Sequence, residues 1–184
     1  MQPVPLPTGG LIYTKYSYDS NSNRVGQLWY TNRAGSAGKA LTSQAANCSQ
    51  PSLSPDGHNV AMICNYGKQV SYLTIASWNG SVLGPLQTVI SDQLVAQPIW
   101  APDGSGIAYL APGGPAAPFQ LWWLPKARYA PPPPPVPSPT PGGPHNGPLP
   151  TPSPTAVPTP PVVKPIQLTT NLGFDATSPL AWSG

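Results

Sequence analysis

Short runs of apolar and β-branched residues, separated by turn-forming residues, recur along the chain. Residues 60–64 (VAMIC) and 107–111 (IAYLA) each follow an Asp-Gly turn, and residues 11–15 (LIYTK) have the same character. Gly, Pro, Asn and Ser bound these runs, which is the pattern of β-strands joined by tight turns. No segment carries apolar residues at the 3.6-residue spacing over the length of a helix. The pattern predicts an all-β fold.

The predicted strands belong to a repeat. Residues 50–57 (QPSLSPDG) match residues 97–104 (QPIWAPDG), 47 positions later, and a degenerate copy lies at 178–184. Two other pairs of segments recur in the same phase: 27–30 with 120–123, and 39–42 with 166–169. Each unit therefore holds four short strands in about 40 to 50 residues, which is the spacing of a four-stranded antiparallel propeller blade.

A proline-rich tract interrupts the third repeat. Residues 130–163 contain no charged residue and many of the chain's 30 prolines. Because proline fixes φ and donates no backbone hydrogen bond, we expect a disordered insertion of extended polyproline II character. We interpret it as a spacer or linker, with a docking strip or an O-glycosylated stalk as alternatives. Trp100 and Trp182 lie 82 residues apart, 35 more than the period of 47, which indicates an insertion within one blade.

Composition and charge exclude several classes of protein. Only 7% of the residues are charged and none is Glu, which excludes coiled coils and long solvated helices. The net charge is +3, but the basic residues are spread along the chain, whereas nucleic-acid binding needs a dense basic stripe. We therefore expect no nucleic-acid partner.

Targeting signals are missing from the sequence. No run of about 18 apolar residues exists, so we expect no membrane span. The first residues (MQPVP) have neither a basic nor an apolar region, so no signal peptide is visible. Either the protein is cytoplasmic or the chain lacks its true beginning.

The Pro-Asp-Gly triplets predict a specific hairpin. Each fits a type I turn followed by a left-handed glycine, which is the three-residue loop with a bulge. Because the same Asp stands in both copies of a repeat, we interpret it as a turn residue rather than a catalytic group. The predicted structural turn residues are Pro55, Asp56, Gly57, Pro102, Asp103 and Gly104.

The first of these loops would place two cysteines opposite each other. If Ser54 faces His58, the two residue numbers of every cross-strand pair add up to 112. The numbers of Cys48 and Cys64 also add up to 112, so these residues would face each other. Opposed Cα atoms at a hydrogen-bonded pair lie about 5.5 Å apart, which is within disulfide range. We predict a cross-strand disulfide if the protein occupies an oxidising compartment. With no CxxC motif and no His nearby at ligand spacing, no metal site is expected.

No arrangement of residues indicates catalysis. The five Asp residues form no convergent pair, His58 flanks a turn, and His145 lies in the proline-rich tract. Neither a hydrolase elbow nor a phosphate or dinucleotide fingerprint occurs. We therefore predict a protein that is not an enzyme and that has no catalytic residue, no cofactor and no metal.

The six tryptophans fall into two groups. Four recur in repeat phase, which indicates core packing: Trp29, Trp100, Trp122 and Trp182. The other two, Trp78 and Trp123, lie outside that phase and are candidates for stacking on a sugar or peptide ligand. The alternative for both is burial between neighbouring blades, because blades cover both faces of each sheet.

Residues 50–57 and 97–104 are two copies of one octapeptide pattern. After the octapeptide come a strand like residues 107–109, then a Leu-Trp strand, then a Leu-Thr pair. This order of segments resembles the TolB-type, WD-like β-propeller repeat. The resemblance covers most of the chain outside the proline-rich tract and is most specific at 50–64 and 97–111. It implies a propeller whose Pro-x-Trp strand is innermost. It also implies a role as a periplasmic or extracellular interaction platform, or as the gating propeller of certain serine peptidases.

The resemblance also implies domain boundaries. We expect an N-terminal tail at 1–9 and propeller blades at 10–129, of which the first is partial and lacks its first strand. The insertion follows at 130–163, and residues 164–184 hold the end of the third blade and the first strand of the next. Two complete blades do not close a ring. A fragment of a longer propeller is favoured; a two-fold dimer with six blades and an open arc are the alternatives.

Together these features predict a partial β-propeller that serves as a non-catalytic scaffold for protein–protein interaction, in the periplasm or outside the cell. Two alternatives stay open: the regulatory propeller of a serine hydrolase whose catalytic domain lies elsewhere, and a carbohydrate-binding propeller.

Overall fold

The computed structural model describes residues 3–33, 35–68, 70–91, 93–126 and 164–182. Within these residues the chain forms three four-stranded antiparallel sheets, and its only helix is η1, a 3-10 turn at Gln44–Ala46. The predicted all-β fold built from four-stranded antiparallel blades is confirmed. The insertion predicted at 130–163 lies outside the described residues.

The strands follow one another in each sheet in chain order, so each sheet is a meander, and we call the sheets blades 1, 2 and 3. Blade 1 contains β1 (Val4–Pro5), β2 (Leu11–Tyr18), β3 (Arg24–Thr31) and β4 (Lys39–Ala40). Blade 2 contains β5 (Cys48–Leu53), β6 (Asn59–Cys64), β7 (Tyr72–Ser77) and β8 (Gln87–Ile90). Blade 3 contains β9 (Ala96–Trp100), β10 (Gly106–Pro112), β11 (Phe119–Pro125) and β12 (Ile166–Gln167).

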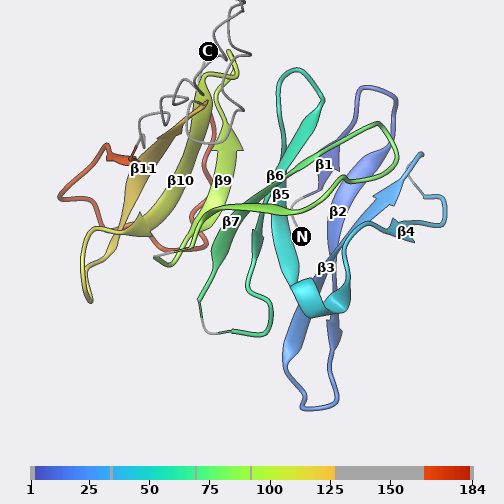
Figure 1. Ribbon diagram of the computed structural model, residues 1–184, viewed down its shortest axis with the longest axis horizontal. Helices are drawn as coiled ribbons and strands as arrows, with labels where there is room; N and C mark the ends of the chain where they lie inside the picture. The colour runs from blue at the N-terminus through green and yellow to red at the C-terminus, as the bar shows by residue number, and fades with distance from the viewer. Residues whose placement is uncertain (1–2, 34, 69, 92, 127–163, 183–184) are drawn as a thin grey trace, which may run out of the picture.

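The blades stand side by side in chain order, with blade 2 in the middle (Figure 1). One apolar cluster joins blades 1 and 2 through side chains such as Ile12, Leu28 and Met62. A second cluster joins blades 2 and 3 through side chains such as Ile75 and Tyr109. The first strands, β1, β5 and β9, line one common groove of about 390 Å³. The sheets therefore curve around a shared axis with their first strands innermost, as in a β-propeller.

Blade 1 has its own first strand, which corrects the expectation of a partial first blade preceded by an N-terminal tail at 1–9. Val4 pairs with Ile12, and Pro5 pairs with Leu11. The turn that joins these strands uses Gly9 at a φ of 84°. Residues 2–9 (QPVPLPTG) carry the same Gln, Pro and Gly positions as the octapeptide. The copy was missed because Thr8 replaces the Asp of the triplet.

The segment predicted as the first strand of a fourth blade does not form a strand in the described chain. Residues 178–182 pair with no strand, although they lie close to blade 3. Gln97 Nε2 donates to the Ala176 carbonyl at 3.4 Å, and Leu180 lines the groove between the inner strands. The segment therefore occupies the place of a further inner strand without a sheet to pair with.

The predicted register of the first Pro-Asp-Gly hairpin is wrong by one residue. Ser54 pairs with Asn59, not with His58, since Ser54 N donates to Asn59 O at 2.8 Å. The loop has four residues because the Asp56 carboxylate accepts from His58 N at 3.0 Å and so holds His58 inside the turn. The residue numbers of the cross-strand pairs next to the turn therefore add up to 113 instead of the predicted 112.

A bulge at Gln50 and Pro51 restores the predicted register farther along the hairpin. Gln50 has a φ of 53°, and the pairing shifts by one residue between Ser49 and Ser52. Beyond it, Cys48 faces Cys64, and a disulfide joins them. Their Cα atoms are 4.1 Å apart, nearer to the spacing of a non-hydrogen-bonded pair than to the 5.5 Å expected.

The bulge is a property of the repeat. Gln97, which stands one period after Gln50, has a φ of 52°, and the β9–β10 pairing shifts at the same place. The following prolines donate no backbone hydrogen bond, so a break in the ladder at this point leaves no donor unpaired. At the bulge Gln97 N donates to Gln50 Oε1 at 2.7 Å, which ties blade 3 to blade 2.

Candidate functional site

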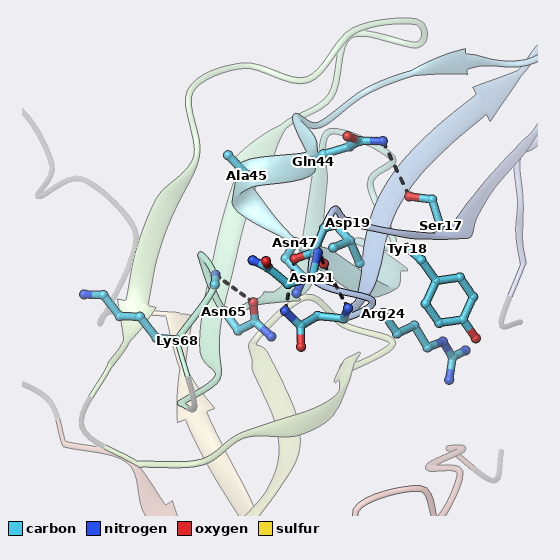
Figure 2. A pocket seen from close by; sticks show the side chains of 13 residues that line it. Ser17, Tyr18, Asp19, Asn21, Arg24, Gln44, Ala45, Asn47, Asn65 and Lys68 are labelled. Atoms are coloured by element: carbon cyan, nitrogen blue, oxygen red, sulfur yellow. Dashed lines mark hydrogen bonds between the residues drawn. The ribbon is translucent and has the colours of Figure 1, made fainter.

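A polar cleft of about 620 Å³ opens at one end of blades 1 and 2 (Figure 2). Three loops form it: the β2–β3 hairpin loop, the segment around η1, and the turn between β6 and β7. These loops come from two blades, so the cleft exists only because the blades pack together.

The β2–β3 hairpin loop is held by one carboxylate. Asp19 Oδ1 accepts from the backbone N of Asn21 and of Asn23, both at 2.9 Å, and its Oδ2 accepts from Asn23 Nδ2 at 3.2 Å. These hydrogen bonds, chiefly those from Asn23, hold the pKa of the Asp19 carboxyl below its usual value. Asp19 is therefore an ionised brace of the loop and is not suited to act as a general acid.

Asn47 forms the floor of the cleft. It ends η1 in a left-handed conformation, at a φ of 46°, which Asn tolerates better than most residues. Its Oδ1 accepts from Gly26 N of blade 1 at 2.6 Å, and its carbonyl accepts from Asn65 N at 3.3 Å. Asn47 thus connects all three walls. Because it directly precedes Cys48, the disulfide fixes its position.

Gly26 is required at the floor because blade 2 approaches it closely. A Cβ at this position would lie 2.7 Å from the Cys48 carbonyl oxygen. We expect Gly26→Ala to lower the free energy of unfolding by about 1–3 kcal/mol, the usual cost of overpacking. Urea unfolding measures the change. Gly114→Ala is the matched control, because no heavy atom lies within 4 Å of the added carbon. Equal stability of the two variants would contradict the close approach.

The rim of the cleft carries exposed side chains that can contact a ligand. The Arg24 guanidinium carbon lies 3.6 Å from the centre of the Tyr16 ring, and this stacking orients the cation. Tyr18 is 75% exposed. Lys68, on the β6–β7 turn, extends on the side of the cleft opposite Arg24 (Figure 2). The cleft therefore combines an amide-rich floor with the exposed Tyr18 ring and two cations.

The residues predicted from the Pro-Asp-Gly triplets lie elsewhere and act within their own turns. Asp56 Oδ1 accepts from Ser54 Oγ at 2.5 Å, and this bond chiefly lowers the pKa of Asp56. Asp103 Oδ1 accepts from Ser105 Oγ at 2.6 Å and from Ser105 N at 2.9 Å, and its pKa is lowered by these bonds. The glycines Gly57 and Gly104 have φ values of 72° and 69°.

The two tryptophans proposed as stacking platforms differ in their burial. Trp78 is 5% exposed and packs edge-on against Tyr30 at 5.3 Å between ring centres, so its interpretation as a ligand platform is wrong. Trp123 is half-buried, and the edge of Trp182 lies 6.3 Å from it between ring centres. Trp78 is thus taken up by packing within the protein, whereas Trp123 keeps part of its surface accessible.

The cleft residues were missed at the sequence level. One signal was present: the loop Asp19-Ser20-Asn21-Ser22-Asn23 carries two amide side chains and one carboxylate in five residues. Its meeting with Asn47 and Lys68 depends on how blade 1 packs on blade 2, which no local pattern records.

In the part of the chain that the structure describes, no group of three or more His, Cys, Asp or Glu side chains could hold a metal ion. Likewise, that part of the chain contains no helix with the length and apolar character needed to cross a membrane.

The three blades and their packing define this chain as a partial β-propeller. No family model and no curated protein matches the sequence. Solved structures that are similar in fold include TolB from Acinetobacter baumannii, with 14% identity and a TM-score of 0.49 over 65% of this chain and 29% of that one. TolB is also the protein whose repeat type the octapeptides resemble.

Two further similar structures carry the names of peptidases. The apo AtxE2 isopeptidase has 14% identity and a TM-score of 0.44 over 60% of this chain and 20% of its own. A prolyl endopeptidase has 16% identity and a TM-score of 0.43 over 68% and 20%. This chain spans less than a third of the length of each of the three structures.

Proposed function

We propose that this chain is a non-catalytic propeller scaffold that binds a protein partner outside the cytoplasm, through the cleft between blades 1 and 2. The observation that carries the proposal is the construction of the cleft. Its loops are braced from within by Asp19 and Asn47, while Tyr18, Arg24 and Lys68 stay exposed at the rim.

The rim favours a partner segment that carries negative charge. Asp19 is the acid of the cleft, and its two carboxylate oxygens already accept three hydrogen bonds from the loop. The two cations therefore remain for a ligand. Arg24 is oriented by its ring contact and can donate two parallel N–H hydrogen bonds to a carboxylate.

The disulfide supports the proposed location. Cys48 and Cys64 are both fully buried and joined, and disulfides persist in oxidising compartments such as the periplasm and the extracellular space.

The proposal is tested by cross-linking at the rim. A photo-reactive phenylalanine analogue in place of Tyr18 is expected to give a discrete adduct with one protein in extracytoplasmic material from the native source, identified by mass spectrometry. The double variant Arg24→Glu/Lys68→Glu should reduce that adduct at least about tenfold, since charge reversal turns attraction into repulsion.

The matched control reverses two cations outside the cleft. Lys39→Glu/Lys164→Glu has the same net charge change, and both lysines are exposed. This control should leave the adduct unchanged. Equal loss in both double variants, or no loss in either, would contradict the cleft as the binding site.

A further inference from the structure

In the described chain, an Asp or Asn is followed by Gly at three turns: Asp56-Gly57, Asn79-Gly80 and Asp103-Gly104. At such a pair the backbone nitrogen of the glycine can attack the side-chain carbonyl carbon, since glycine has no Cβ to hinder the approach. The attack closes a five-membered succinimide ring. Whether it occurs depends on how the fold holds the glycine N–H and the side-chain carbonyl.

The two Asp-Gly turns hold both groups back. In each of them the glycine N–H donates to the backbone carbonyl three residues earlier, at 2.9 Å. Neighbouring serine hydroxyls chiefly hold the pKa of Asp56 and of Asp103 below its usual value, so both side chains are carboxylates at neutral pH. A carboxylate resists a nucleophile because it already carries negative charge. These two turns are therefore protected.

The turn between β7 and β8 leaves both groups available. Asn79 and Gly80 are exposed, and Gly80 N donates no hydrogen bond to any residue that the structure describes. Asn79 Oδ1 accepts three hydrogen bonds: from Ser81 N at 3.0 Å, from Val82 N at 2.8 Å and from Ser81 Oγ at 3.3 Å. The neutral side-chain amide is thus polarised and held against the backbone of its own turn.

The three donors are arranged as an oxyanion hole. Attack on Asn79 Cγ converts Oδ1 into an oxyanion, and hydrogen bonds to a charged acceptor are roughly twice as strong as those to a neutral one. The donors therefore stabilise the transition state more than the unreacted amide. Because the turn already places them, no rearrangement is needed at the moment of attack.

We propose that Asn79 is a self-modification site at which the fold promotes succinimide formation with Gly80. Gly80 N loses its proton to water and forms a bond to Asn79 Cγ. The bond from Cγ to Nδ2 breaks, and Nδ2 takes up a proton and leaves as ammonia. Water then adds to one of the two ring carbonyls and opens the ring, which gives aspartate or isoaspartate at position 79.

The two products affect the contact between blades 1 and 2 differently. Aspartate keeps the backbone unchanged, and its carboxylate can accept from the same three donors. Isoaspartate adds a methylene group to the backbone directly after Trp78, whose N donates to His58 O at 2.7 Å and whose ring packs on Tyr30 of blade 1. We therefore expect isoaspartate to loosen this contact and aspartate to preserve it.

Peptide mapping by mass spectrometry, on the folded full chain kept in mildly alkaline buffer, tests the proposal. We expect aspartate and isoaspartate to accumulate at position 79, while Asp56 and Asp103 keep their normal linkage. Conversion in the folded chain should be at least as fast as in the same chain unfolded in urea. Ser81→Ala removes one of the three donors and should slow the conversion about two- to tenfold. Ser20→Ala, in another exposed turn, is the matched control and should leave the rate unchanged.

Three results would overturn the proposal. The first is an Asn79 amide that persists in the folded chain but is lost in urea, since the fold would then protect the site. The second is isomerisation of Asp56 or Asp103 as fast as the conversion of Asn79. The third is a Ser81→Ala variant that converts as fast as Ser20→Ala. Unchanged circular dichroism of each variant at the start of the incubation establishes that the fold is kept.

Discussion

Replacing Cys48 and Cys64 together by alanine is expected to lower the free energy of unfolding by about 3 kcal/mol. The disulfide closes a short loop, with a sequence separation of 16, and cross-links of that span restrict the unfolded chain by about this amount. Both residues are fully buried in the cluster between blades 1 and 2, so alanine leaves no unpaired polar atom behind. Urea unfolding under non-reducing conditions measures the loss.

Reduction supplies the control for this prediction. A reducing agent should lower the unfolding midpoint of the wild-type protein toward that of the double variant, and it should leave the double variant unchanged. Equal midpoints for the oxidised wild-type protein and the double variant would show that the disulfide contributes nothing to stability.

Tyr109→Ala is expected to have a still larger effect, a loss of about 3–5 kcal/mol in the free energy of unfolding. Tyr109 is fully buried between blades 2 and 3, and its hydroxyl accepts from Gln93 Nε2 at 3.0 Å. Removing a large buried ring costs transfer free energy and leaves a cavity. Tyr109→Phe, which keeps the ring, should lose only about 1 kcal/mol.

The control for the ring is an exposed tyrosine. Tyr18→Ala should change the free energy of unfolding by less than about 0.5 kcal/mol, since surface substitutions rarely cost more. Similar losses for Tyr109→Ala and Tyr18→Ala would mean that blades 2 and 3 are not held together by their shared core.

The blades could be predicted from sequence because their strands and turns are local features repeated in phase. The Leu-Thr pairs at 41–42 and 168–169 are an example. Thr42 Oγ1 accepts from Leu28 N at 3.0 Å, and Thr169 Oγ1 accepts from Leu121 N at 2.9 Å, so in blades 1 and 3 a threonine ends the outer strand in the same way. Because the repeated Leu-Thr pair makes the same hydrogen bond each time, the repeat in the sequence is enough to predict a strand end there.

The disulfide shows how a correct pairing can rest on an incomplete argument. The loop after Ser54 is one residue longer than predicted, and the bulge at Gln50 removes one residue from the register. The two deviations cancel at Cys48. Neither follows from turn propensity alone: the first accompanies the hydrogen bond from His58 N to Asp56 Oδ1, and the second accompanies the hydrogen bond from Gln97 N to Gln50 Oε1.

The cleft could not be predicted because its parts are distant in sequence and come together only through packing. Asn23 and Asn65 belong to different blades, and their separation is set by the close approach of Gly26 to Cys48. The first strand of blade 1 was missed for a different, local reason. Thr8 stands where the octapeptide has Asp, although the Gln, Pro and Gly positions of residues 2–9 match the octapeptide and residues 4–5 form the strand.

The proline-rich tract falls between β11 and β12, two strands that are hydrogen-bonded neighbours at the outer edge of blade 3. Pairing of Trp122 with Gln167 fixes both ends of the intervening segment, whatever its length. The entropy of closing such a loop grows only logarithmically, by about 0.6 kcal/mol for each doubling. Evolution can therefore lengthen, shorten or rewrite the tract almost without cost to folding, which makes this rim position a natural place to graft a new module.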